Sequence, residues 1–227
     1  MTGKLLVTAA FLGLAAPALA QTPDKFLLIG GSANAFRGEL NQYYNRFKPA
    51  VHATLQFNEK KRFNGAINLQ VGQLQMQSPM QTIQVPENAT ASVANSVETS
   101  FIGLNYDLHF NFIKTDNWIL YISQGIGLLR FEPKDAAGNG LVNNTTTRAP
   151  QEEYSQISLM LPTSLGAQYV FKNGYGIGAQ AGLMNPTTKY LDNLEDLAGN
   201  QQSDNVLQFR FSFIAPLGFK DEAPMME

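Results

Sequence analysis

The sequence predicts an all-β fold: an eight-stranded, antiparallel, up-and-down transmembrane β-barrel that follows a cleaved signal peptide. Three observations lead to this prediction. Apolar residues recur at every second position in eight segments, short and long connections alternate between the segments, and a pair of aromatic residues flanks each short connection. A period of two residues is the signature of a β-strand whose two faces meet different surroundings.

The first twenty residues form a separate unit with the parts of a secretory signal peptide. Lys4 gives a positive start, residues 5–14 are apolar, and Ala18-Leu19-Ala20 forms a small-x-small cleavage pattern. An N-terminal membrane anchor is the alternative, but a spanning helix needs about 20 apolar residues. We therefore predict a signal peptide at 1–20, an outer-membrane β-barrel domain at 21–219 and a short acidic tail at 220–227.

The composition excludes several kinds of chemistry. Only 15% of the 227 residues are charged, the formal net charge is −2, and Lys60-Lys61-Arg62 is the longest basic run. We therefore expect no nucleic-acid partner. The chain has no cysteine, which excludes disulfides, thiol catalysis, iron–sulfur clusters and acylation at a cysteine.

The predicted strands differ in how regular their alternation is. In 102–112, the even-numbered residues are apolar and the odd-numbered ones are small or polar, whereas 25–33 is apolar on both faces. The segment 118–131 is less regular, because Gln124 falls on its apolar face. Most segments have the length of a tilted membrane strand. The eight are 25–33, 51–57, 63–72, 102–112, 118–131, 157–169, 175–183 and 207–213.

The connections separate a membrane barrel from a soluble sandwich, which would show the same alternation. Three connections are short, and the stretches between them are long and polar. Outer-membrane barrels have this arrangement, with tight periplasmic turns and larger external loops. The short connections are 58–62, 113–117 and 170–174, and the long ones are 34–48, 75–99, 132–155 and 185–205.

Aromatic residues flank all three short connections. Both members of each pair fall on the face of the apolar stripe, so the pairs would form an aromatic girdle at the periplasmic interface. A soluble sandwich has no reason to place bulky aromatic residues outward beside every second turn. The pairs are Phe57 with Phe63, Phe112 with Trp118, and Tyr169 with Tyr175.

The opposite faces of the predicted strands carry polar residues that would fill the barrel. Eight strands leave an interior just wide enough for side chains. We expect a hydrogen-bonded plug in which Asp107 and Arg210 are charge partners if they lie at similar depth. The inward residues are His52, Asn68, Gln70, Asn105, Asp107, His109, Asn111, Ser158, Gln180, Gln208 and Arg210.

No residue pattern predicts a catalytic, cofactor-binding or metal-binding site. His109 is followed two positions later by Asn111, so a His-x-Ser nucleophile arrangement is missing. The two histidines fall on different predicted strands without metal-ligand spacing. The acidic stretch 187–198 lacks calcium-loop spacing, and we interpret it as a solvated loop. Its acids, with one nearby, are Asp192, Glu195, Asp196 and Asp204.

Four stretches of the chain carry a family resemblance. Within 118–136 it rests on Tyr121, Gly125, Gly127, Phe131 and Pro133, and within 31–40 on Gly31, Phe36, Gly38, Glu39 and Leu40. It continues with Pro162, Gly166 and Tyr169, and with Tyr190-Leu191-Asp192-Asn193-Leu194. These elements resemble a Bacteroidetes-type family of small outer-membrane barrels, which are eight-stranded and OmpA/OmpX-like. One branch is the outer-membrane barrel component of the type IX secretion system, which associates with a periplasmic ring of a lipoprotein and a partner protein.

The prediction that follows is a non-enzymatic protein of the cell outer membrane, without a cofactor. It would contact outer-membrane lipid and act by binding a periplasmic or outer-membrane protein, and a type IX secretion scaffold is its concrete form. An outer-membrane lipid-modifying enzyme and a narrow small-solute channel are the alternatives.

Overall fold

The computed structural model describes residues 25–38, 43–57, 61–77, 82–85, 89–92, 96–144, 153–194 and 204–217. This part of the chain contains no helix long and apolar enough to cross a membrane. The predicted signal peptide at 1–20 and the predicted tail at 220–227 lie outside the described residues, as do both limits of the predicted barrel domain at 21–219.

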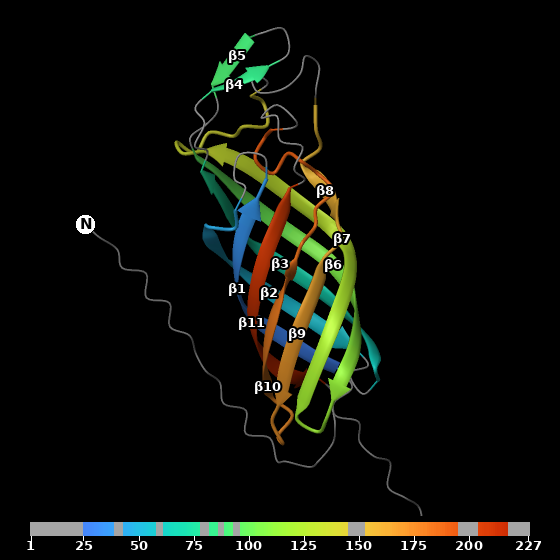
Figure 1. The fold of residues 1–227 in the computed structure, drawn as a ribbon. Helices are drawn as coiled ribbons and strands as arrows, with labels where there is room; N and C mark the ends of the chain where they lie inside the picture. The colour runs from blue at the N-terminus through green and yellow to red at the C-terminus, as the bar shows by residue number, and fades with distance from the viewer. Residues whose placement is uncertain are drawn as a thin grey trace, which may run out of the picture.

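The described strands form a closed antiparallel barrel (Figure 1). Each wall strand pairs with its neighbour in the chain, and β1 pairs with β11 to close the wall. The wall strands are β1 (Lys25–Arg37), β2 (Phe47–Phe57), β3 (Phe63–Gln77), β6 (Ser96–Lys114), β7 (Trp118–Asp135), β8 (Ile157–Met160), β9 (Thr163–Val170), β10 (Gly176–Leu183) and β11 (Asn205–Leu217).

Strands β8 and β9 are two halves of one wall position. β7 pairs with β8 through Gly127 and Met160, and with β9 through Gln124 and Thr163, so one register continues through the gap. Pro162 lies in the gap and has no N–H group to donate to the sheet. The described strands therefore occupy eight wall positions, which confirms the predicted eight-stranded up-and-down barrel.

The predicted alternation of connections is confirmed. Strands β2 and β3, β6 and β7, and β9 and β10 are joined at one end of the barrel by the short connections 58–62, 115–117 and 171–175. We call this the turn end, and the opposite end the loop end. Beyond the loop end, in 75–99, β4 (Thr82–Val85) and β5 (Ala89–Ser92) form a separate hairpin that the sequence did not predict (Figure 1).

An apolar belt surrounds the wall from the turn end upward. Its outward side chains are mostly large and exposed, while their chain neighbours point inward and are buried. Gln124 is the polar exception on β7, as predicted, and it accepts a hydrogen bond from Thr163 Oγ1 at 2.7 Å. Members of the belt include Ile29, Val51, Leu69, Val71, Ile102, Leu104, Leu108, Ile122, Leu128, Leu165, Ile177 and Phe211.

Nearer the loop end, the two faces of the wall exchange character. On β3, Gln73, Gln75 and Gln77 point outward, while Leu74 and Met76 point inward and are buried. The outward row of β7 likewise changes to charged residues after Leu128. This exchange interrupts the apolar stripe. The strands predicted from that stripe therefore end earlier than β3 and β7 do. The exchange also marks where the wall leaves the hydrocarbon of the membrane, because an apolar outer face suits lipid and a polar one suits water.

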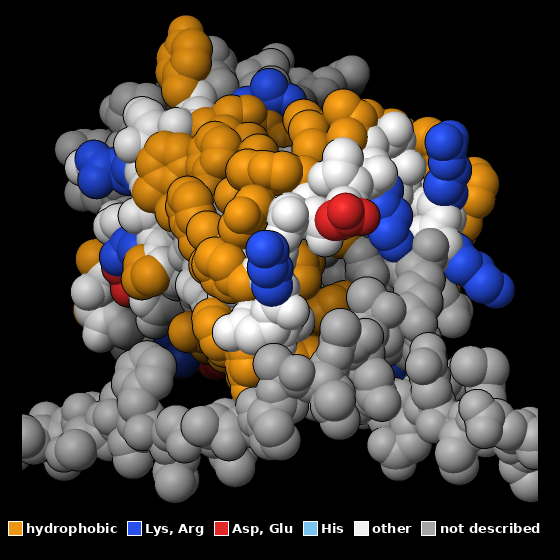
Figure 2. All heavy atoms as spheres, turned by 90° about the horizontal axis from the view of Figure 1, so that it is seen from below, with side chains coloured by type: hydrophobic (Ala, Val, Ile, Leu, Met, Phe, Trp, Pro, Cys, Tyr) orange, Lys and Arg blue, Asp and Glu red, His pale blue; other side chains and the backbone are white. Residues whose placement is uncertain are grey.

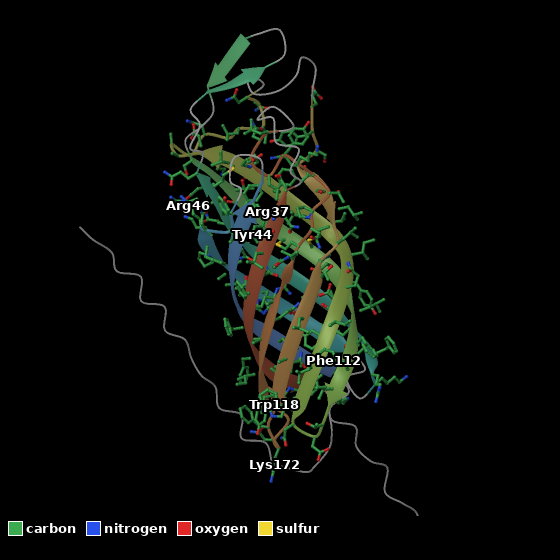
Figure 3. The ribbon with its side chains drawn as sticks, viewed as in Figure 1. Arg37, Tyr44, Arg46, Phe112, Trp118 and Lys172 are labelled. Atoms are coloured by element: carbon green, nitrogen blue, oxygen red, sulfur yellow. The ribbon has the colours of Figure 1, made fainter. Side chains whose placement is uncertain are left out.

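The aromatic residues beside the turns lie on the outer face, as predicted. Phe63 and Trp118 are exposed, and Tyr169 and Tyr175 are half-buried. Trp118 and Tyr169, which belong to different pairs on neighbouring strands, have ring centroids 4.9 Å apart. Figure 2 views this end and shows hydrophobic side chains with Lys and Arg side chains spread round them. Trp118 lies near the turn end in Figure 3.

Glycines on the inner face make room for large side chains. A Cβ atom at Gly166 would lie 2.2 Å from Cζ of Tyr121, whereas one at Gly178 on the neighbouring strand would have no contact closer than 3.6 Å. We therefore expect Gly166→Ala to lower the free energy of unfolding by about 1–3 kcal/mol, the usual cost of overpacking. Gly178→Ala is the matched control and should cost less than half as much. Urea unfolding in detergent measures both, and equal costs would contradict this packing.

Candidate functional site

The barrel interior in the membrane zone holds a charged network centred on Arg210. Arg210 Nη2 donates to Gln70 Oε1 at 2.9 Å, and its Nε donates to Gln208 Oε1 at 2.5 Å. Its Nη1 donates to Asn68 Oδ1 at 3.4 Å, and Asn68 Nδ2 donates to Asp107 Oδ2 at 2.7 Å. The side chain of Asn68 therefore lies between Arg210 and Asp107. The sequence suggested a direct ion pair between these two residues, but in the structure Asn68 connects them by hydrogen bonds.

Asn105 and Asn34 extend this network, and the predicted polar plug is confirmed for the membrane zone. Asp107 Oδ1 also accepts from Asn105 Nδ2 at 2.6 Å. Gln208 Nε2 donates to Asn34 Oδ1 and to Gln70 Oε1, at 2.6 and 2.8 Å. All predicted inward residues are buried except Gln180, which is half-buried. Such a network holds the barrel together because several of its hydrogen bonds join side chains of different strands.

A serine–histidine contact inside the barrel was missed by sequence reasoning. His52 Nε2 and Ser212 Oγ are 2.9 Å apart. His52 on β2 and Ser212 on β11 both pair with Gly30 on β1, so the two side chains meet across a residue without one. Only the strand register brings them together, and no local sequence pattern signals it.

This contact lacks the third member of a hydrolytic triad. A catalytic histidine is oriented by a carboxylate that accepts from its second ring nitrogen. His52 Nδ1 has no hydrogen-bond partner among the described residues. The other histidine, His109, stacks on Tyr121 with ring centroids 4.5 Å apart. The pair can form a structural hydrogen bond, and its geometry supplies no oriented general base.

A hydrophobic core closes the loop end of the barrel above the polar network. It combines inward residues of the wall with residues from the connections β7–β8 and β10–β11. Tyr154 and Tyr190 pack against it and stack on each other, with centroids 4.3 Å apart and planes 9° from parallel. We call this cluster the cap. It consists of Phe36, Ala50, Leu74, Met76, Val97, Phe101, Leu129, Phe131, Leu141, Met160, Met184, Leu191, Leu194 and Val206.

The acidic stretch after β10 contributes to the cap, so its interpretation as a solvated loop was wrong for residues 191–194, which are buried. Leu191, Asp192 and Leu194 are 2%, 2% and 1% exposed. Thr99 Oγ1 donates to Leu191 O at 2.6 Å, and Leu191 N donates to Asp204 Oδ2 at 2.8 Å. Leu191 and Leu194 are buried because the inner face of the wall at the loop end is apolar, and they pack against it. Glu195 and Asp196 lie outside the described residues.

Comparison with known proteins identifies the fold. No protein-family model matches the chain, and no curated protein matches its sequence. Among solved structures, Neisserial surface protein A superposes with a TM-score of 0.54 at 8% identity, over 86% of this chain and 97% of that one. Ail of Yersinia pestis, in complex with a heparin analogue, gives 0.48 at 9% identity, over 86% and 99%. The outer-membrane enzyme PagL gives 0.37 at 14% identity, over 84% and 99%.

The closed antiparallel wall agrees with the fold of Neisserial surface protein A. The chain has the fold of an outer-membrane β-barrel. Only a closed barrel lets strands cross a membrane with every backbone hydrogen bond satisfied. The likeness supports the small eight-stranded barrel class. The more specific Bacteroidetes-type resemblance stays a prediction.

Some of the residues that carry the Bacteroidetes-type resemblance lie in the cap of the barrel. Phe36, Phe131 and Leu191 come from three different motifs and belong to one core, and Tyr190 packs against it. A Cβ atom at Gly38 would lie 2.4 Å from the ring of Phe36, which explains why a glycine follows at that position. These motif residues therefore have a structural role in closing the loop end.

The described residues offer no metal centre, since no three of their His, Cys, Asp or Glu side chains are grouped to hold an ion. The prediction that the barrel has no catalytic or cofactor-binding residue stays untested.

Proposed function

We propose that this barrel is a non-enzymatic structural or interaction component of the cell envelope, which binds another envelope component through its loop end or its turn end. One observation carries the proposal: the polar network and the cap both fill the interior, so the outer surfaces are what the molecule offers to a partner. In outer-membrane barrels, the short turns face the periplasm and the long loops face outside. Copurification from detergent-solubilised outer membrane tests the proposal, and a barrel that always elutes alone would contradict it.

A scaffold of the type IX secretion system is the concrete form of this proposal. Its support is the resemblance in the four sequence motifs, which implies a periplasmic lipoprotein ring as the partner. The turn end would meet that partner, and its described residues include Lys61, Arg62, Lys114 and Lys172 beside a single acid, Asp116. Copurification of a lipoprotein with the barrel supports this form, and its loss on charge reversal at Lys172, exposed on the β9–β10 turn, would locate the contact (Figure 3).

A conductance measurement tests the alternative that this barrel is a narrow channel for small solutes. Because the membrane zone is filled by hydrogen-bonded side chains, we expect no conductance steps from the purified barrel in planar bilayers. Regular steps would contradict the filled interior.

The enzyme alternative rests on the Ser212–His52 contact. We expect the lipid A of a deletion strain to have the mass spectrum of the parent strain. A change that is restored by the natural chain but not by Ser212→Ala would overturn the non-enzymatic proposal.

A further inference from the structure

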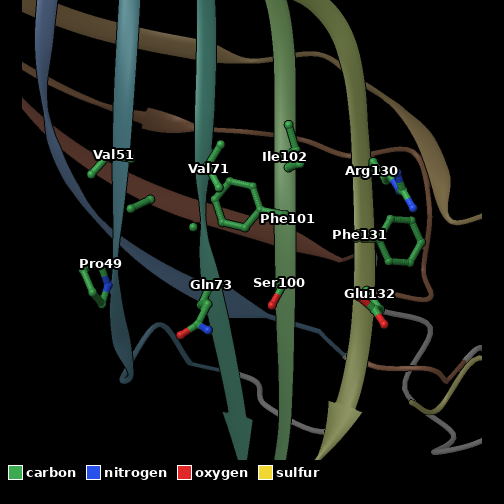
Figure 4. Close-up of a pocket in the computed structure, with 12 residues that line it drawn as sticks. Pro49, Val51, Val71, Gln73, Ser100, Phe101, Ile102, Arg130, Phe131 and Glu132 are labelled. Atoms are coloured by element: carbon green, nitrogen blue, oxygen red, sulfur yellow. The ribbon is translucent and has the colours of Figure 1, made fainter. Parts of the chain in front are cut away.

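A shallow hollow of about 660 Å³ lies on the outer wall across β2, β3, β6 and β7 (Figure 4). It spans the level where the wall exchanges its apolar face for a polar one. Val51, Val71 and Ile102 are consecutive cross-strand partners and form its apolar row, which ends at Arg130 on β7. Gln73 and Ser100 are partners in the next row toward the loop end. Ser100 is the shortest of the outward side chains in these two rows.

The charged group at the end of the apolar row has no partner among the described residues. Arg130 is exposed, and its side chain forms no hydrogen bond or ion pair with the described residues. Glu132 is the nearest acid along β7 on the same face and also lines the hollow, where it pairs with Lys134 at 3.5 Å. Figure 4 shows Arg130 at one side of the hollow, beside Ile102. An arginine at a membrane boundary lays its carbon chain on apolar surface and directs its guanidinium toward the head groups.

These features together fit one kind of occupant. The apolar row lies at the edge of the hydrocarbon, the level that the first methylenes of an acyl chain occupy. Guanidinium binds phosphate through two parallel hydrogen bonds, which a neutral head group cannot offer. The loop end faces the outer leaflet of an outer membrane. We propose that this hollow binds one phosphate-bearing lipid of the outer leaflet. Its phosphate lies at Arg130, and an acyl chain lies on Val51, Val71 and Ile102.

This site goes beyond the proposed binding of an envelope protein, and either can fail without the other. A lipid occupant fits an apolar row that ends at a cation without a partner among the described residues. A protein occupant would have to enter the plane of the membrane to reach the apolar row.

Native mass spectrometry of the detergent-solubilised full chain tests the site. The probes are lipid A with its phosphates and the same lipid with the phosphates removed. We expect one phosphorylated lipid to bind saturably, and removal of the phosphates to weaken binding at least as much as Arg130→Gln does. Arg130→Gln should weaken it about tenfold, since a charge-assisted hydrogen bond contributes this much to affinity.

Two further variants separate this site from general attraction to a basic surface. Arg46→Gln removes an exposed arginine charge at the loop end outside the hollow and should leave binding unchanged. Ser100→Phe fills the hollow without changing charge and should weaken binding as Arg130→Gln does, provided that the variant keeps the heat-modifiable migration of a folded barrel. Equal effects of Arg130→Gln and Arg46→Gln, or equal binding of the lipid without phosphate, would overturn the proposal.

Discussion

Replacing Arg210 with methionine is expected to lower the free energy of unfolding by about 3–5 kcal/mol, the cost of breaking a buried charged network by removing one partner. Asp107 would stay buried without the positive charge that Asn68 connects to it. Gln70 and Gln208 would each lose the donor that Arg210 provides. Urea unfolding in detergent measures the change, followed by the fluorescence of Trp118, the single tryptophan.

Two control variants are needed to interpret the stability of Arg210→Met. Lys172→Gln removes an exposed charge at the turn end and should change stability by no more than about 0.5 kcal/mol. Adding Asp107→Asn to Arg210→Met removes the stranded carboxylate and should recover part of the loss, because the two sites are coupled. A small effect of Arg210→Met, or full additivity of the pair, would show that the network does not hold the barrel together.

Removing the ring of Phe131 is expected to release the cap while leaving the membrane zone folded. Phe131 is 1% exposed and stacks on Tyr154, with centroids 6.0 Å apart and planes 7° from parallel. Phe131→Ala should cost the cap about 3–5 kcal/mol, as large-to-small changes in a core do. Hydrogen exchange of 190–194 should rise sharply, while the barrel keeps its heat-modifiable migration.

The matched control for this change is Tyr43→Ala. Tyr43 is 72% exposed at the loop end, so its removal should leave exchange in 190–194 unchanged. If both variants behaved alike, or if Phe131→Ala unfolded the membrane zone as well, the cap would not be a separately packed unit.

The sequence predicted the wall because each strand buries one face only. Period-two alternation gives strand and register together in 102–112, where apolar and polar residues never exchange places. The same rule does not predict the end of β3 at Gln73–Gln77, because beyond the membrane boundary the apolar side chains of this strand point inward. The hairpin β4–β5 was missed inside a stretch that reads as a polar loop.

Features that depend on several strands were less predictable. The inward polar residues could be named from their strand faces. The His52–Ser212 contact requires the register across three strands, and the Asn68 bridge joins β3, β6 and β11 across the barrel interior. The cap was missed because Leu191 and Leu194 stand among acids, and only the apolar barrel mouth makes their burial favourable.

In-cell photo-crosslinking followed by mass spectrometry tests most directly whether this barrel acts by binding another envelope protein. A photoreactive residue at Tyr43 reports on the loop end, one at Lys172 on the turn end, and one at Phe211, which is 69% exposed on the apolar belt, on the surrounding lipid. We expect a discrete protein partner at one of the two ends and none at Phe211. Folded barrel that yields no protein crosslink from either end would contradict the account.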